Sequence, residues 1–275
     1  MTAKLRIGVT ALSCVLWSCL MCTSVVFLTG CASNALSTSM NSDLVTDSDE
    51  PETRKRARLR LELAVAYFDK GQTTDALDHL KQSIAADPNL FEAYNLRGLI
   101  YMRLNDVPLA EESFRRALAI NPKSASVQHN YGWLLCQQAR LPEAVQLFGS
   151  ALANPNYGDR AKTWMTQGLC QQKYAQHADA EASFLRSYEL DAGNPITAYN
   201  LSLLLYQRAD FVRAQFYVRR LNNSELANAE SLWLGIKVER RLDNREATLQ
   251  LGAQLKKRFP QSREYLALER GAFNE

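Results

Sequence analysis

Glycine and proline are scarce in this chain, with 12 glycines and 8 prolines among 275 residues. Collagen-like and low-complexity chains need far more of both, so those architectures are excluded. An excess of charge of one sign is also missing. Lys4 and Arg6 are two of the 32 basic residues and stand in a first stretch of thirty that holds no acid, so 30 basic residues face 29 acidic ones in the remainder. A nearly neutral body lacks the basic face that nucleic acids require, so we expect no nucleic-acid partner.

Residues that commonly carry catalysis are rare as well. The chain has 3 histidines, His79, His129 and His177, and each falls in a different part of the sequence. It shows no phosphate-binding loop, no nucleophile elbow and no paired histidine motif for a metal. We therefore expect no enzyme activity, no cofactor, no metal site and no small-molecule substrate. His79 and His129 are interpreted as ordinary helix residues.

The only long hydrophobic run lies at the start, from Ile7 to Leu28, directly after Lys4 and Arg6. It ends in Leu-Thr-Gly-Cys at 28–31, the pattern of a bacterial lipobox. We predict a lipoprotein signal peptide over 1–30 and lipid attachment at Cys31. The alternatives are an uncleaved transmembrane helix and an earlier cleavage before Cys14. Ala32 is not the aspartate that retains lipoproteins in the inner membrane, so we expect an outer-membrane protein held at the periplasmic face by its acyl chains.

The stretch after the lipobox has no helical or strand period. Residues 32–53 hold no lysine or arginine and are rich in Ser, Thr, Asn, Asp and Glu. We therefore predict a lipidated N-terminus and disordered tether over 31–53. A basic cluster follows, made of Arg54, Lys55, Arg56, Arg58 and Arg60. It is either a solvated first helix turn or a contact with acidic lipid head groups.

The remainder repeats itself with a period of about 34 residues, which is typical of tetratricopeptide (TPR) repeats. The first repeating column holds small residues: Ala64, Gly98, Gly132, Gly168, Ser202 and Gly235. A second column is always alanine: Ala76, Ala110, Ala144, Ala180, Ala214 and Ala247. A third holds larger apolar residues: Leu80, Phe114, Phe148, Phe184, Val218 and Leu251. The first column has spacings of 34, 34, 36, 34 and 33 residues, with the two extra residues in the loop-like segment 154–158.

These columns predict an all-α fold, a right-handed TPR superhelix (α-solenoid) of about six helix-turn-helix repeats. We place the solenoid over 54–275, with repeats near 57–90, 91–124, 125–158, 161–194, 195–227 and 228–261, and then a C-terminal cap. The small residues let two helices approach closely, and the larger residue fills the space between them. One helix pair cannot bury its apolar face, so neighbouring repeats must stack.

The first helix of each repeat should line a concave groove for a protein partner. At the groove-facing positions stand Leu61, Phe68, Asn95, Leu99, Met102, His129, Asn130, Trp133, Met165, Leu169, Tyr199, Asn200 and Tyr206. This set is apolar and aromatic, which suits an apolar helix or an extended peptide, and the asparagines could bond the ligand backbone. The alternative is that several of them pack between repeats. The face lacks a basic clamp, so a peptide held by its terminal carboxylate is not expected.

Two of the 6 cysteines, Cys136 and Cys170, lie in the body of the chain. They fall in the first helices of neighbouring repeats, and the periplasm is oxidising, so a disulfide is possible. Their positions within the repeat differ, twelfth against tenth, which would separate their Cα atoms. The alternative is two small buried hydrophobic residues, and the sequence leaves the choice open.

Several segments resemble the type IV pilus biogenesis lipoproteins called PilF or PilW, the pilotins of the pilus secretin. They are Asn130–Cys136 (NYGWLLC), Gly168-Leu169-Cys170, Leu232–Arg240 (LWLGIKVER) and Leu255–Ser262 (LKKRFPQS). The resemblance covers nearly the whole chain. It implies six TPR repeats, an acylated N-terminus at Cys31, and secretin (PilQ-like) subunits as partners. It also implies a role in carrying those subunits to the outer membrane for multimer assembly, as pilus biogenesis and twitching motility require.

Two other classes of function remain open at the sequence level. A TPR lipoprotein could serve as the scaffold of another envelope machine, for outer-membrane protein assembly or as a protease adaptor. A cell-wall hydrolase accessory fused to repeats would need a pair of acids in a cleft, and the sequence offers no such pair. Identification of the captured partner separates these classes.

Overall fold

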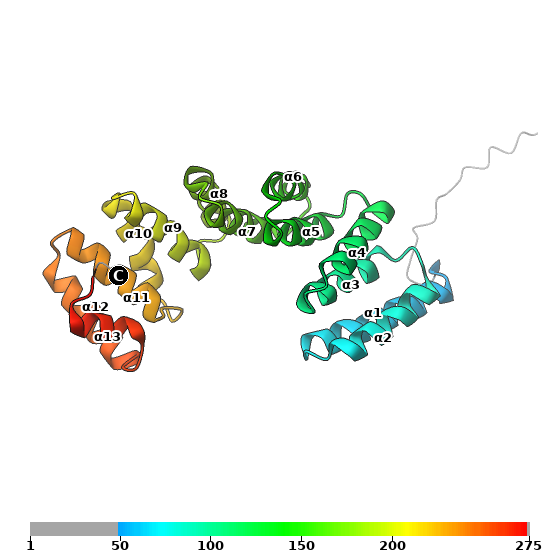
Figure 1. Cartoon of the computed structure of the whole chain (residues 1–275), viewed down its shortest axis with the longest axis horizontal. Helices are drawn as coiled ribbons and strands as arrows, with labels where there is room; N and C mark the ends of the chain where they lie inside the picture. Colours follow the sequence, from blue (N-terminus) through cyan, green and yellow to red (C-terminus); the bar gives the residue numbers. More distant parts are fainter. Residues whose placement is uncertain (1–48, 274–275) are drawn as a thin grey trace, which may run out of the picture. The chain divides into compact units, whose positions relative to one another are not determined.

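The computed structural model describes residues 49–273, and these form thirteen α-helices and no strand. The helices lie within one compact unit, Thr46–Glu275. In chain order they are α1 (Glu52–Asp69), α2 (Thr73–Ala86), α3 (Phe91–Arg103), α4 (Val107–Ile120), α5 (Ala125–Gln137), α6 (Leu141–Leu152), α7 (Arg160–Lys173), α8 (His177–Leu190), α9 (Pro195–Gln207), α10 (Phe211–Asn222), α11 (Ala229–Arg241), α12 (Arg245–Arg258) and α13 (Arg263–Arg270). They pair into successive helix hairpins, and each hairpin packs against the next (Figure 1). The predicted all-α TPR superhelix is thus confirmed.

Every hairpin turns at a residue whose backbone is left-handed. The six residues are Gly71, Asn105, Ala139, Ala175, Ala209 and Asp243, with φ between 55° and 79°. The next residue then donates its N–H to the carbonyl five residues back, as Asp106 does to Tyr101 and Arg140 to Leu135, both at 2.9 Å. This bond closes the C-terminus of the first helix and directs the chain into the second. The turn therefore occurs at the same point of every repeat.

Close approach of the two helices depends on the missing side chain of glycine. A Cβ added to Gly98 would lie 2.6 Å from the Phe114 ring, and one added to Gly168 would lie 2.8 Å from the ring of Phe184. Both phenylalanines are completely buried. The glycine of the first column and the phenylalanine of the third therefore fill one space together, as the sequence analysis expects.

The last two hairpins vary this packing. Ser202 replaces the glycine in α9, and its hydroxyl donates to the Ala214 carbonyl at 2.9 Å. In α11 a Cβ on Gly235 would meet the Asn222 amide at 2.5 Å, so the close neighbour comes from the preceding hairpin. Beyond α12, helix α13 packs on both α11 and α12 and covers their apolar residues. This helix serves as the cap that a solenoid needs at its open end.

The N-terminal boundary differs slightly from the prediction. Helix α1 begins at Glu52, two residues inside the predicted tether, and Pro51 precedes it. Glu50 pairs with Arg58 at 3.1 Å and with Arg54 at 3.8 Å. These ion pairs tie the segment before α1 to its first turns, and Lys55 pairs with Glu52 at 3.0 Å. Much of the basic cluster is therefore neutralised within the fold.

The predicted signal peptide over 1–30, the lipidated Cys31 and most of the predicted tether lie outside the described residues. Among the helices of 49–273, none is both long enough and apolar enough to cross a membrane.

Candidate partner-binding groove

The first helices of successive hairpins form one layer. Direct contacts link α1 to α3, α3 to α5, α5 to α7, α7 to α9 and α9 to α11. Twelve of the thirteen predicted groove residues are half-buried there: Leu61, Phe68, Asn95, Leu99, Met102, Asn130, Trp133, Met165, Leu169, Tyr199, Asn200 and Tyr206. A half-buried side chain packs on its neighbours with one side and keeps another side accessible. These residues therefore pack between repeats, and their contact with a partner stays a prediction.

Asparagine side chains connect the layer and keep bonding capacity. The Asn130 Nδ2 in α5 donates to Asn95 Oδ1 in α3 at 3.0 Å. Each amide uses only one of its two polar atoms in this bond, so the other atom can bond a peptide backbone. Asn200 in α9 donates to its own helix instead, at the Ile196 carbonyl, at 2.8 Å.

His129 differs from the rest of the predicted groove because its side chain is buried, with 6% exposed. Its Nδ1 lies 2.8 Å from Thr163 Oγ1 in α7, and the Tyr157 hydroxyl lies 3.0 Å from the same oxygen. Burial, reinforced by the charge of Lys162, lowers the pKa of His129 from 6.5 to about 4. His129 is therefore a neutral packing group between two hairpins. The prediction that it faces a partner in the groove is wrong, because its side chain is buried.

Phe68, at the N-terminal end of the layer, carries a guanidinium on its ring. The Arg103 guanidinium carbon lies 3.8 Å from the ring centroid, and Arg103 Nη1 donates to the Phe68 carbonyl at 2.7 Å. This cation–π contact holds α1 against α3 and covers one face of the ring. Phe68 therefore offers a partner less apolar surface than its residue type suggests.

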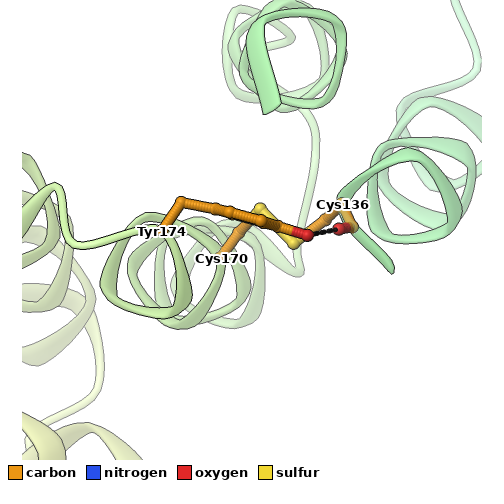
Figure 2. Close-up of a disulfide and its surroundings, with 3 residues drawn as sticks. All are labelled: Cys136, Cys170 and Tyr174. Carbon is orange, nitrogen blue, oxygen red and sulfur yellow. Dashed lines mark hydrogen bonds between the residues drawn. A yellow bond between two sulfur atoms is a disulfide. The ribbon is translucent and has the colours of Figure 1, made fainter. Parts of the chain in front are cut away.

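A disulfide joins the layer at its centre. Figure 2 shows Cys136 of α5 bonded through sulfur to Cys170 of α7, and their Cα atoms lie 5.9 Å apart. The Tyr174 hydroxyl donates to the Cys136 carbonyl at 2.8 Å beside it. The different repeat positions do not separate the cysteines, since this Cα distance is usual for a disulfide. The bond crosses the hairpin boundary that contains the two extra loop residues.

A cavity of about 490 Å³ lies at the C-terminal end of the layer, between α9, α11 and α13. Tyr199 and Leu203 line it from α9, and Trp233 and Lys237 line it from α11. The Trp233 ring stacks on Phe273 at 5.2 Å, which holds the indole in place. The predicted groove residues end at Tyr206 in the fifth repeat, so this cavity was not predicted. The signal was present in the LWLGIKVER segment, which places an aromatic residue and a lysine on one helix.

A metal site would require a cluster of metal-ligating side chains. Within 49–273, no group of three or more His, Cys, Asp or Glu side chains is close enough to hold a metal ion. The first-helix layer consists of apolar and aromatic side chains with amides between them.

Comparisons with known proteins agree with this arrangement. The tetratricopeptide repeat family matches residues 61–125 and 95–159. The type IV pilus assembly protein PilF of Pseudomonas aeruginosa is 30% identical over 240 residues, which cover 87% of this chain and 92% of that protein. A solved structure of Pseudomonas aeruginosa PilF matches with a TM-score of 0.72 at 28% identity, over 80% of this chain and all of that one. A crystal structure of PilW, described as a widely conserved type IV pilus biogenesis factor, matches with a TM-score of 0.68 at 30% identity, over 77% of this chain and 97% of that one.

Proposed function

Because the chain belongs to the PilF/PilW family of TPR proteins of type IV pilus biogenesis, we propose that it is an outer-membrane lipoprotein pilotin. It binds subunits of the type IV pilus secretin through the first-helix layer and promotes their outer-membrane localisation and multimerisation. It acts as an adaptor and carries out no reaction of its own. The protein is anchored at the periplasmic face by acyl chains on Cys31.

The observation that carries this proposal is the layer of half-buried apolar and aromatic side chains, from Leu61 in α1 to Tyr206 in α9. A secretin subunit presents apolar surface before it inserts into the membrane. A groove of this kind covers such surface by hydrophobic contact, and the free amide atoms of Asn95 and Asn130 bond the backbone of the bound segment.

Transport follows from the anchor. A membrane protein that carries more than one acyl chain stays attached to its bilayer, so whatever the groove holds moves with it. The acyl chains therefore determine where the complex goes, and the groove determines what is carried. The two parts are joined by the segment before α1, so each can be altered without the other.

A change in the groove tests the binding step. Leu99→Asn places an amide at a half-buried groove position of α3. We expect capture of purified secretin subunits to weaken about tenfold, as for a residue that contributes more than 1 kcal/mol to an interface. Capture by the purified full-length protein in detergent, read by immunoblotting, measures it.

Leu104→Asn is the matched control, because Leu104 directly follows the same helix as its C-cap and is 48% exposed. It should bind secretin like the wild type, and both variants should keep the wild-type helical circular dichroism. Equal capture by the two variants would contradict the groove assignment. If the wild type captures an outer-membrane assembly component or a protease and no secretin, the protein is the scaffold of another envelope machine.

A further inference from the structure

Lys237 in α11 is a cation in a protein-lined site that has no acidic partner. Its side chain is half-buried, and its Nζ lies 5.7 Å from the ring centroids of both Tyr206 and Trp233. None of the ion pairs among residues 49–273 involves it. Burial lowers the pKa of Lys237. A charge that is removed from water without a partner destabilises the site that holds it.

The two acids that line the same cavity share one basic partner. Arg263 of α13 pairs with Glu264 at 2.7 Å and with Glu230 of α11 at 3.3 Å. Arg270 also lines the cavity, and no ion pair in the described part of the chain includes it. Three basic and two acidic side chains line the cavity, so its formal net charge is +1.

The other walls are apolar. Tyr199 and Leu203 of α9 and Ala267 of α13 face the same space as Trp233. A ligand must therefore bring one negative charge together with apolar surface. A cavity of about 490 Å³ is large enough for two side chains of a peptide. Nucleic acid does not fit, because one excess positive charge neutralises too few phosphates.

We propose that this cavity binds an acidic side chain, Asp or Glu, of a partner peptide, with a neighbouring apolar side chain packed against Tyr199, Leu203 and Trp233. Lys237 is the residue that pairs with the carboxylate, and Arg270 adds to the positive potential. The inference rests on the proposed function, since the peptide belongs to the protein that occupies the first-helix layer. It assigns to that protein an acidic residue beside an apolar one at the end of the bound segment.

Selection from a random peptide library tests the chemistry without any assumption about the partner. The peptides are displayed with their C-termini fused, so that the only carboxylates are those of Asp and Glu side chains. We expect the wild-type protein to enrich peptides in which Asp or Glu stands next to an aromatic or aliphatic residue. Lys237→Met should lose this enrichment, and Lys237→Arg should keep it. Selected peptides without acidic enrichment, or no selected peptides at all, would overturn the proposal.

A synthetic peptide from that selection then gives the magnitude. Lys237→Met should weaken its binding about tenfold, the usual effect of losing a hydrogen bond to a charged group. Replacement of the peptide's acid by its amide should have the same effect on the wild type and none on the variant. Lys81→Met, at an exposed lysine of α2, is the matched control and should bind normally.

Thermal unfolding separates a binding role from a structural one. Lys237→Met keeps the apolar stem and removes a half-buried charge that has no acidic partner, which offsets the loss of two weak cation–π contacts, so its unfolding temperature should stay close to that of the wild type. A clear drop in that temperature together with weaker binding would assign Lys237 to packing and overturn the proposal.

Secretin capture distinguishes failure of this inference from failure of the proposed function. If Lys237→Met and the wild type capture secretin equally, the inference fails and the pilotin function stands. If acidic peptides are selected but secretin is not captured, the cavity chemistry stands and the pilotin function fails.

Discussion

A single missing methyl group decides how closely the helices of one repeat approach. Gly132 shows this in α5, since an added Cβ would lie 2.9 Å from the Phe148 ring and 3.2 Å from the Ala144 carbonyl oxygen. The ring is completely buried and the carbonyl belongs to a helix, so neither can retreat without moving α6. Replacing Gly132 by alanine should therefore destabilise the fold through packing and not through helix propensity.

Gly132→Ala should lower the free energy of unfolding by about 1 kcal/mol or more. The destabilisation by overpacking is larger than the stabilisation from the better helix propensity of alanine. Gly149→Ala is the control within the same repeat, since a Cβ there would meet nothing within 4 Å. That variant should be stabilised by about 0.5–1 kcal/mol. Urea unfolding measures both, and a stabilised Gly132→Ala would contradict the packing argument.

His129 makes stability depend on pH. Its pKa is lowered to about 4 in the folded protein by burial, from 6.5. Between these two values the unfolded chain binds a proton that the folded chain excludes, so stability is complete above pH 6.5 and falls as the pH drops towards 4. The shift corresponds to about 3 kcal/mol.

His129→Gln should remove this part of the pH dependence, because glutamine does not titrate and can still bond Thr163. We expect the free energy of unfolding of the wild type to fall between about pH 7 and about pH 4 by about 3 kcal/mol more than that of the variant. Parallel urea titrations at the two pH values give the difference. If the wild type and the variant lose the same free energy of unfolding between these pH values, His129 is protonated within the fold.

At the scale of elements, the most specific part of the family resemblance has a structural role. Glu239, in the LWLGIKVER segment of α11, is completely buried and accepts hydrogen bonds from two side chains of α10 and from the residue that precedes α12. Arg219 of α10 donates at 2.6 Å, and Asn244, just before α12, donates at 3.0 Å. Arg240 lies over the Phe273 ring at 3.4 Å, beyond α13. The segment therefore joins the last hairpins and the cap, and by doing so it shapes the cavity around Lys237.

The disulfide between α5 and α7 should stabilise the centre of the solenoid. It closes a loop of 34 residues, for which chain entropy predicts about 3–4 kcal/mol. Reduction should lower the unfolding temperature and increase hydrogen exchange in α5 and α7 more than in α1 or α11. The Cys136→Ala, Cys170→Ala double variant should unfold like the reduced protein and be insensitive to reductant. A wild type that reductant does not affect would contradict this.

At the scale of the whole molecule, anchor and groove should separate. Cys31→Ala removes the proposed acylated thiol, which lies outside the described residues, and leaves every groove residue in place. We expect this variant to capture secretin subunits as the wild type does, while secretin multimers in the outer-membrane fraction fall at least about tenfold. Fractionation followed by immunoblotting measures both quantities.

Cys22→Ala is the matched control, since it changes a cysteine of the predicted signal peptide outside the lipobox. It should leave secretin multimers at the wild-type level. Normal multimers in the outer membrane of the Cys31→Ala strain would contradict the role of the acyl chains in delivery. Mass spectrometry of the processed N-terminus tests the modification itself.

Much of the fold could be predicted because its signals are local and repeated. The alanine column from Ala76 to Ala214 is completely buried in the structure, and Gly98, Gly132 and Gly168 of the first column each face the phenylalanine of their own repeat. The six left-handed turns were not predicted, since only Gly71 among them is a glycine. Alanine at three of these positions gives no residue-type signal for a turn, although the same period of the sequence marks their place.

The sequence by itself therefore determined the helix hairpins, their stacking order and the apolar character of the first helices, because periodic packing positions repeat along the chain. Only the tertiary structure decided which of those residues remain accessible. It buried His129 against Thr163, joined Cys136 to Cys170, and left Lys237 without an acidic partner in a cavity between three helices. The physical reason is that burial, pairing and charge balance depend on neighbours from other repeats, and a repeat read alone does not contain them.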